Sequence, residues 1–165
     1  MKRIHNPMNT PTENQIPSIL VLGNPESACG LIAMALNHRE DVVFTDNAVE
    51  AFNVIEQETI NVVIAFQNDE MGIGMNFLDS VAKVYANTQR VIVSDHADIL
   101  NLISQINDKV INRVITTNLS PEAARAIIEK SEAECIEARE NGAWIHDLRR
   151  QNHQYEFMLR QKLAC

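Results

Sequence analysis

The chain has 165 residues, of which 45% are hydrophobic and 22% are charged, as in a soluble globular protein. This length accommodates one ordinary domain of about 100–150 residues and an additional segment. The formal net charge of −8 argues against a general affinity for the phosphates of nucleic acid, because such binding needs a basic surface. No apolar run approaches the roughly 20 residues of a membrane span, so we expect neither nucleic-acid nor membrane binding.

The amino terminus and the cysteines favour a cytoplasmic protein. Residues 1–15 are polar, contain Pro7 and Pro11, and lack the apolar core of a signal peptide, so we predict a flexible leader over residues 1–16. Cys29, Cys135 and Cys165 are far apart in the sequence and form no Cys-x-x-Cys pair. Because cytosolic proteins remain reduced, we expect these thiols to be free.

Five short apolar runs have the character of buried β-strands, and they cover residues 18–22, 41–45, 60–65, 90–94 and 113–116. The third run, which is followed by Phe66, consists mainly of branched aliphatic residues, as in a strand covered on both faces. Helical patterns follow the runs, near 26–37, after a capping residue at Asp46 or Asn47, at 75–86, at 97–107 and from Pro121. Since parallel neighbours need crossover helices, this order predicts an α/β fold, a doubly wound five-stranded parallel sheet with helices on both faces.

The helical spacing also predicts which side chains cover the sheet. The residues expected to point inward recur at three or four positions and are Cys29, Ile32, Ala33, Leu36, Val49, Phe52, Ile55, Phe77, Leu78, Val81, Val84, Ile99, Leu102, Ile103 and Ile106. Residues 17–130 are therefore expected to form the folded domain.

The last helical pattern continues far beyond the length needed to cover a sheet. It begins with a capping hydroxyl, a proline and an acid at Ser120-Pro121-Glu122 and runs without proline to the end of the chain. At 1.5 Å per residue it would span roughly 65 Å. We predict that residues 131–165 form a helical stalk or coiled-coil extension, with Asn141-Gly142 as the point where the helix could kink or stop.

Within this pattern, residues recur like a coiled-coil seam at steps of three, four or seven. The seam consists of Ile128, Cys135, Ala138, Ile145, Leu148, Asn152, Tyr155, Leu159 and Leu163. Asn152 is of the type that sets register in dimers, so the sequence favours pairing with a second copy or continuation into an output module. A helical hairpin that folds back on the domain is the alternative.

The order of the elements and several strand ends resemble the receiver domain of two-component response regulators, a CheY-like fold. The resemblance covers residues 16–130 and rests on segments 19–22, 60–66, 71–78, 90–98 and 112–122. It implies the sheet order 2-1-3-4-5, with a crevice beyond the carboxyl ends of strands one and three.

The family's activity needs five groups: an acceptor aspartate after the third strand, two acids that hold Mg²⁺, a hydroxyl and a lysine. Position by position, the acceptor falls on Phe66 and the acid pair on Gly23 and Asn24. The hydroxyl falls on Ser94 and the lysine on Thr117. Only the hydroxyl is present. The resemblance therefore implies a degenerate pseudo-receiver that lacks the phosphoacceptor and uses no metal or cofactor.

From this resemblance we expect a non-enzymatic, phosphorylation-independent signalling module. Its expected partners are a second copy of the chain, a signalling output domain or a component of a histidine-kinase pathway. Two alternatives stay open. The crevice could bind a small uncharged molecule as a sensor, or Asp69, just beyond Phe66, could serve as an atypical phosphoacceptor.

Overall fold

The computed structural model describes residues 17–23, 30–67, 72–95 and 99–163, with the backbone alone at 99–101 and 144–147. The chain divides into two units, the first ending at Cys135 and the second beginning at Ile136. The predicted leader lies outside the described residues. None of the described helices combines the length and apolarity needed to cross a membrane.

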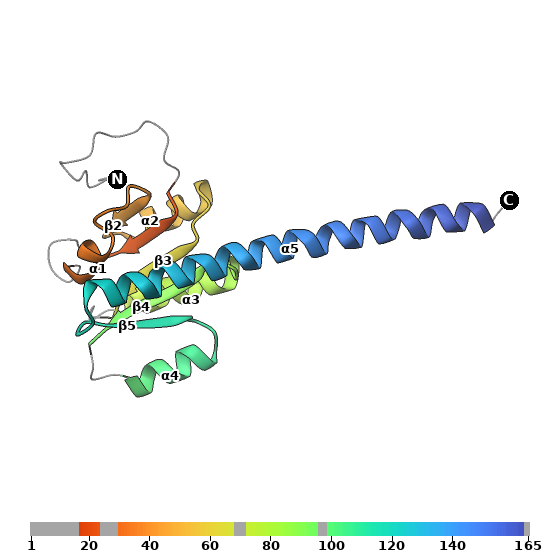
Figure 1. Cartoon of the computed structure of the whole chain (residues 1–165). Coiled ribbons are helices and arrows are strands. Elements are labelled where there is room, and N and C mark those ends of the chain that lie inside the picture. Colours follow the sequence, from red (N-terminus) through yellow and green to blue (C-terminus); the bar gives the residue numbers. More distant parts are fainter. Residues whose placement is uncertain (1–16, 24–29, 68–71, 96–98, 164–165) are drawn as a thin grey trace. The chain divides into compact units, whose positions relative to one another are not determined.

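The first unit is built on a five-stranded parallel sheet (Figure 1). Its strands are β1 (Ile19–Leu22), β2 (Val42–Thr45), β3 (Val62–Phe66), β4 (Gln89–Ser94) and β5 (Arg113–Thr116). The spatial order is β2-β1-β3-β4-β5, and every neighbouring pair is parallel. The predicted fold class and strand order are confirmed, with β3 at the centre of the sheet.

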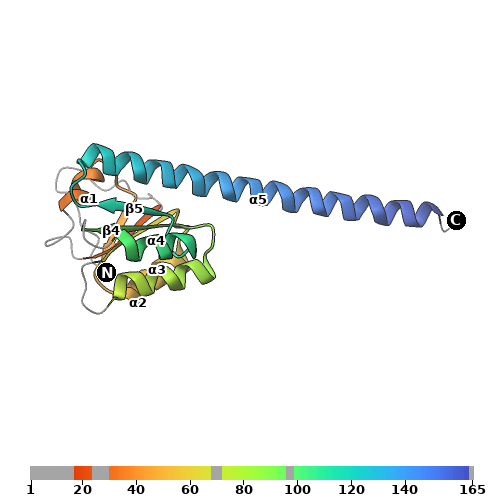
Figure 2. The same cartoon turned by 90° about the horizontal axis from the view of Figure 1, so that it is seen from below.

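The helices are α1 (Gly30–Ala35), α2 (Ala48–Gln57), α3 (Ile73–Val84), α4 (Ile99–Asn107) and α5 (Pro121–Leu163). Two apolar clusters fill the two faces of the sheet. One cluster joins the strands to buried residues of α2, α3 and α4, and the other joins them to α1 and the first turns of α5 (Figure 2). Along β1 the side chains alternate between the clusters, as a strand covered on both faces requires.

Four residues predicted to point inward are exposed instead. Val49 is 68% exposed and Val84 70%, and Ile103 and Ile106 are also exposed. A step of three residues turns a helix by about 300°, so residues spaced by threes drift around the surface by about 60° a step. Val49 lies two such steps before Ile55 and therefore faces away from the buried side of α2, which consists of Ala51, Val54 and Ile55. Asn47 does cap this helix, since its side chain accepts a hydrogen bond from the Val49 amide at 2.8 Å.

A buried arginine closes the amino-terminal edge of the sheet. The Arg90 guanidinium, on β4, donates to the carbonyl oxygens of Thr88 at 2.7 Å, Val110 at 2.9 Å, Lys109 at 2.9 Å and Ala86 at 3.3 Å. Burial lowers the pKa of Arg90. The guanidinium thus joins the turn before β4 to the turn before β5, where Lys109 adopts a left-handed φ of 59°.

Candidate functional site

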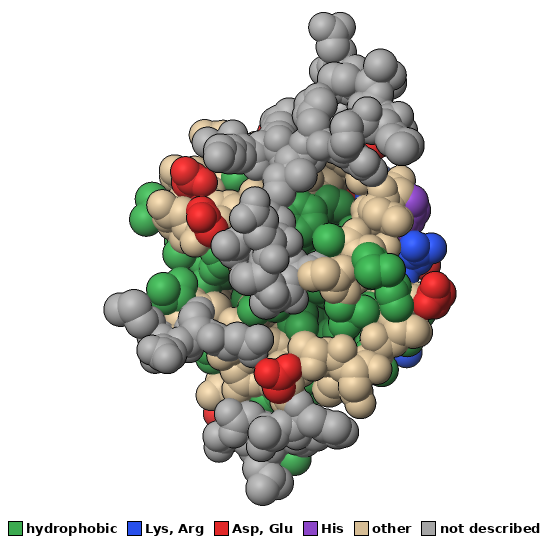
Figure 3. Space-filling view, turned by 90° about the vertical axis from the view of Figure 1, so that its left-hand side faces the viewer, with side chains coloured by type: hydrophobic (Ala, Val, Ile, Leu, Met, Phe, Trp, Pro, Cys, Tyr) green, Lys and Arg blue, Asp and Glu red, His purple; other side chains and the backbone are tan. Residues whose placement is uncertain are grey.

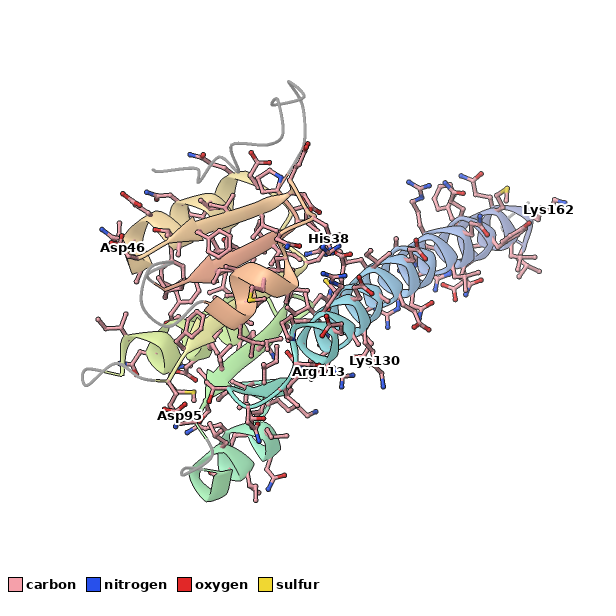
Figure 4. All side chains as sticks on the ribbon, turned by 60° about the vertical axis from the view of Figure 1, so that its left-hand side comes forward. His38, Asp46, Asp95, Arg113, Lys130 and Lys162 are labelled. Atoms are coloured by element: carbon pink, nitrogen blue, oxygen red, sulfur yellow. The ribbon has the colours of Figure 1, made fainter. Side chains whose placement is uncertain are left out.

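Parallel strands end at a common edge, so the residues that follow β1, β3, β4 and β5 lie together. Figure 4 shows Asp46 and Asp95, which follow β2 and β4, toward this carboxyl edge, while His38 and Arg113 lie toward the opposite edge. Ligands of doubly wound sheets bind at the carboxyl edge. Figure 3 views the first unit from that side and shows hydrophobic side chains between the segments drawn in grey.

Phe66, which is predicted to stand where a receiver carries its acceptor, is the last residue of β3. Its side chain is only 7% exposed and belongs to the apolar cluster that also holds Val93 and Ile115. The start of α3 packs on this strand end, because a Cβ added to Gly74 would overlap the Phe66 carbonyl oxygen. A phenyl ring has no nucleophilic atom, so this position contributes packing and no phosphoryl chemistry.

The hydroxyl at the end of β4 is bound by neighbouring groups of the chain. Ser94 Oγ donates to Gln67 Oε1, and the same oxygen lies 2.9 Å from the Asp95 carbonyl oxygen. The backbone N–H of Gln67, which directly follows Phe66, donates a hydrogen bond to the Val93 carbonyl oxygen at 3.0 Å. Sequence reasoning missed Gln67, whose only signal is a polar side chain immediately after a buried strand.

The residue in the lysine position is likewise engaged. Thr117 Oγ1 donates to Asp95 Oδ1 at 2.7 Å, and the neighbouring Thr116 Oγ1 donates to Asn118 Oδ1 at 2.5 Å. Asp95 therefore joins the ends of β4 and β5, a contact that the sequence analysis did not predict. The hydroxyls of Ser94 and Thr117 and the carboxylate of Asp95, which a ligand would meet on this rim, already form hydrogen bonds within the chain.

The remaining predicted positions give an incomplete site. Gly23 continues β1, with its amide donating to the Thr45 carbonyl oxygen at 2.8 Å, and it offers no side-chain ligand. Asn24 and Asp69 lie outside the described residues. Among the residues that the structure describes, no three His, Cys, Asp or Glu side chains lie together as a metal site would need. The structure thus brings Gly23, Phe66, Ser94 and Thr117 to one edge.

The predicted seam divides between the two units. Ile128 and Cys135 are fully buried in the first unit, with Ile128 in the apolar cluster beneath α5. Their side chains are therefore covered within the first unit. Heptad spacing alone does not distinguish burial on a sheet from burial against another chain. The exposed seam members of the second unit are Ala138, Leu148, Asn152, Tyr155, Leu159 and Leu163. The side chain of Ile145 lies outside the described ones.

The backbone of α5 is continuous from Pro121 to Leu163. No turn interrupts it at Asn141-Gly142, so the predicted alternative of a helical hairpin is wrong. The second unit by itself, residues 136–163, is a single helix, and its large apolar side chains that the structure describes are exposed.

No protein-family model matches the sequence, and no curated protein matches it. Solved structures do. The chain is similar to the signal receiver domain of an HD domain-containing protein from Pseudomonas fluorescens Pf-5, with a TM-score of 0.66 and 18% identity over 81% of this chain and 98% of that one. A CheY-like response regulator receiver domain protein from Methanospirillum hungatei JF-1 matches with a TM-score of 0.61 and 17% identity over 74% and 98%.

A structure named adenylate cyclase, from Rhodopirellula baltica, matches with a TM-score of 0.69 and 12% identity over 79% of this chain and 97% of that one. Identities this low establish the fold and no more. The chain has the fold of response regulator receiver domains, followed along the same helix by an exposed helical segment.

Proposed function

We propose that this protein is a non-catalytic signal-transduction module of the response regulator type, which acts through protein–protein contacts and not through phosphoryl transfer. The buried Phe66 ring at the end of the central strand is the observation that carries this proposal. The receiver fold indicates the class of module. Phe66 cannot accept a phosphoryl group, and phosphorylation is the step that usually changes the state of a receiver.

Phosphoryl transfer to a receiver needs a carboxylate nucleophile and Mg²⁺, a hard cation that requires oxygen ligands. It also needs a cation beside the phosphoryl oxygens. At the matching positions the chain carries Phe66, Gly23 and Thr117, which supply none of these groups. Several groups are absent together, so one substitution would not restore the activity.

Phosphorylation is tested by incubating the purified chain with acetyl phosphate and Mg²⁺ and measuring its intact mass. We expect no added phosphoryl group. The matched variant is Asp69→Asn, which removes the carboxylate nearest in sequence to Phe66. A phosphoryl adduct on the natural chain that disappears in Asp69→Asn would replace this proposal by an atypical phosphoacceptor.

The exposed helix of the second unit supports self-association as the means of contact. Leu148, Tyr155 and Leu159 are exposed at steps of seven and four, the spacing of a two-stranded seam. Asn152 lies between them and is also exposed. The partners in this proposal are a second copy of the chain and, through it, an output domain or a component of a histidine-kinase pathway.

Sedimentation equilibrium of the full chain tests the pairing. We expect a dimer that the double variant Tyr155→Glu/Leu159→Glu converts to a monomer, because charges at seam positions would be buried without partners. Gln154→Glu adds a charge outside the seam, at a position also exposed, and serves as the control. A natural chain that remains monomeric at high micromolar concentration would contradict the pairing and leave the phosphorylation result independent of it.

A small-molecule sensor at the carboxyl edge is the weaker candidate. The hydroxyls of Ser94 and Thr117 are already bonded to Gln67 and Asp95, so a ligand would have to displace contacts within the chain. A thermal-shift screen distinguishes this candidate, since a bound ligand raises the melting temperature according to its affinity.

A further inference from the structure

Two arginines form ion pairs with Glu132 and Glu134 of α5 at the amino-terminal edge of the sheet, the edge opposite Phe66. Arg39, between α1 and β2, donates to Glu132 with Nη1 to Oε1 at 3.2 Å and Nη2 to Oε2 at 2.6 Å. Arg113, at the start of β5, donates from Nη2 to Glu134 Oε1 at 2.5 Å. Figure 4 shows α5 passing between Arg113 and the segment of His38, the neighbour of Arg39. We call Arg39, Arg113, Glu132 and Glu134 the clamp.

The Arg39 side of the clamp is tied into the sheet. Arg39 also holds Asp41 by two parallel bonds, Nε to Oδ1 at 2.9 Å and Nη2 to Oδ2 at 2.7 Å, the fork geometry that arginine forms with carboxylates. Ser18 Oγ donates to Glu132 Oε2 at 2.9 Å and accepts from Asn61 Nδ2 at 2.8 Å. The approaches to β1, β2 and β3 therefore all connect to one carboxylate of α5.

One ion pair of the clamp, Arg39–Glu132, is shielded from water more than a surface pair, whereas Arg113 and Glu134 are 27% and 41% exposed. The side chains of Arg39 and Glu132 are 16% and 20% exposed, whereas Lys83 of the Lys83–Asp79 pair on α3 is 72% exposed. Salt and water screen half-buried pairs less, and removal of one partner leaves the other charge in a desolvated place. The Arg39–Glu132 pair is thus a stronger constraint than an ordinary surface pair.

Apolar packing holds the earlier turns of α5 but thins out along the clamp. Ala124 and Ile128 are fully buried in the cluster under the helix. The next residue on that face is Ser131, a small polar side chain that is fully buried and whose hydroxyl donates back to the Ile127 carbonyl oxygen at 2.9 Å. Between residues 129 and 135 only Cys135 adds a fully buried apolar side chain, so polar bonds carry most of the attachment there.

We propose that the clamp is a conformational latch that determines whether residues 129–135 of α5 are docked on the sheet or released. In this proposal the amino-terminal edge, and not the edge that carries Phe66, controls the helix that continues into the second unit. Docking depends on two ion pairs whose loss shifts a local equilibrium, while Ala124 and Ile128 keep the first turns of α5 in place.

Hydrogen exchange of the full chain, followed by mass spectrometry, tests the latch. In Glu132→Gln/Glu134→Gln we expect amide exchange to accelerate by about tenfold or more in residues 129–136, with residues 121–128 and β3 unchanged. Asp79→Asn, which removes the exposed pair on α3, is the control and should leave residues 129–136 unchanged. Reversing the charges of the second pair, in Arg113→Glu/Glu134→Arg, should keep amide exchange in residues 129–136 near the natural rate.

Two outcomes would overturn the latch. If exchange in residues 129–136 stays at the natural rate in the double variant, the ion pairs do not hold this segment. If exchange accelerates equally in β3 and in all of α5, the clamp contributes to the stability of the whole unit and releases no separate segment.

Discussion

Replacing Phe66 by alanine measures how firmly the ring is built into the sheet. The side chain is 7% exposed, and an aromatic side chain buries roughly 150–250 Å². At about 25 cal/mol per Å², this area corresponds to about 4–6 kcal/mol, of which the remaining methyl group keeps a part. We therefore expect Phe66→Ala to lower the free energy of unfolding by about 3–5 kcal/mol, the usual cost of this truncation in a core.

Urea denaturation followed by far-ultraviolet circular dichroism gives the number. With a slope of about 2 kcal/mol per M, the midpoint should fall by roughly 2 M in Phe66→Ala. Phe66→Leu keeps most of the volume and should cost about 1 kcal/mol. A loss below about 1 kcal/mol in Phe66→Ala would refute the reasoning, because the ring would then be dispensable to the packing of β3.

Phe66→Asp separates packing from chemistry. It should destabilise the fold at least as much as Phe66→Ala, since it also buries a carboxylate among the apolar side chains of the cluster. It should gain no phosphoryl group from acetyl phosphate, because Gly23 and Thr117 still lack the metal ligand and the cation. A folded Phe66→Asp variant that becomes phosphorylated would show that the remaining groups suffice.

Three further predictions concern stability. Arg90→Met should lower the free energy of unfolding by about 3 kcal/mol in urea denaturation, because four carbonyl oxygens lose their donor, and Arg90→Lys should recover part of the loss. Lys109→Gly should raise the free energy of unfolding by about 1 kcal/mol, seen as a higher melting temperature, since only glycine adopts φ near 59° without strain. The Arg39 guanidinium holds the pKa of Asp41 in the folded protein below its ordinary value. The ionised Asp41 therefore stabilises the fold fully above the pKa that it has in the unfolded chain, and this stabilisation is lost as the pH falls through its pKa in the folded protein. The difference in free energy of unfolding between the natural chain and Asp41→Asn should stay constant down to about pH 5 and should decrease toward zero below about pH 4.

The fold was predictable because burial leaves a direct mark on the sequence. A strand covered on both faces needs an unbroken apolar run, and residues 62–66 supply one, so the centre of the sheet could be identified without coordinates. The cap at Asn47 was equally local, since an amide oxygen two residues before the amide it receives needs no tertiary partner. Both signals lie within a few residues of the structure that they specify.

The contacts that define the two edges were not predictable in this way. Gln67 and Ser94 are 27 residues apart, and Arg39 and Glu132 are 93 apart, so their pairing follows from strand order and not from any motif. Arg90 opens a predicted strand like any polar flanking residue, and nothing in the sequence shows that four carbonyl oxygens surround it. Long-range polar pairs become visible only when the backbone places their segments side by side.

The two edges of the sheet can be perturbed independently, which keeps the two proposals distinct. From Asn61 to Phe66 the chain advances by five extended residues, about 16 Å, beyond the roughly 7–10 Å within which substitutions usually couple. Phe66→Leu should therefore leave the exchange of residues 129–136 at its natural rate, and Glu132→Gln should leave the response to acetyl phosphate unchanged. If Phe66→Leu did accelerate exchange there, the carboxyl edge would still communicate with α5, as in a receiver that switches, and control from the amino-terminal edge alone would be wrong.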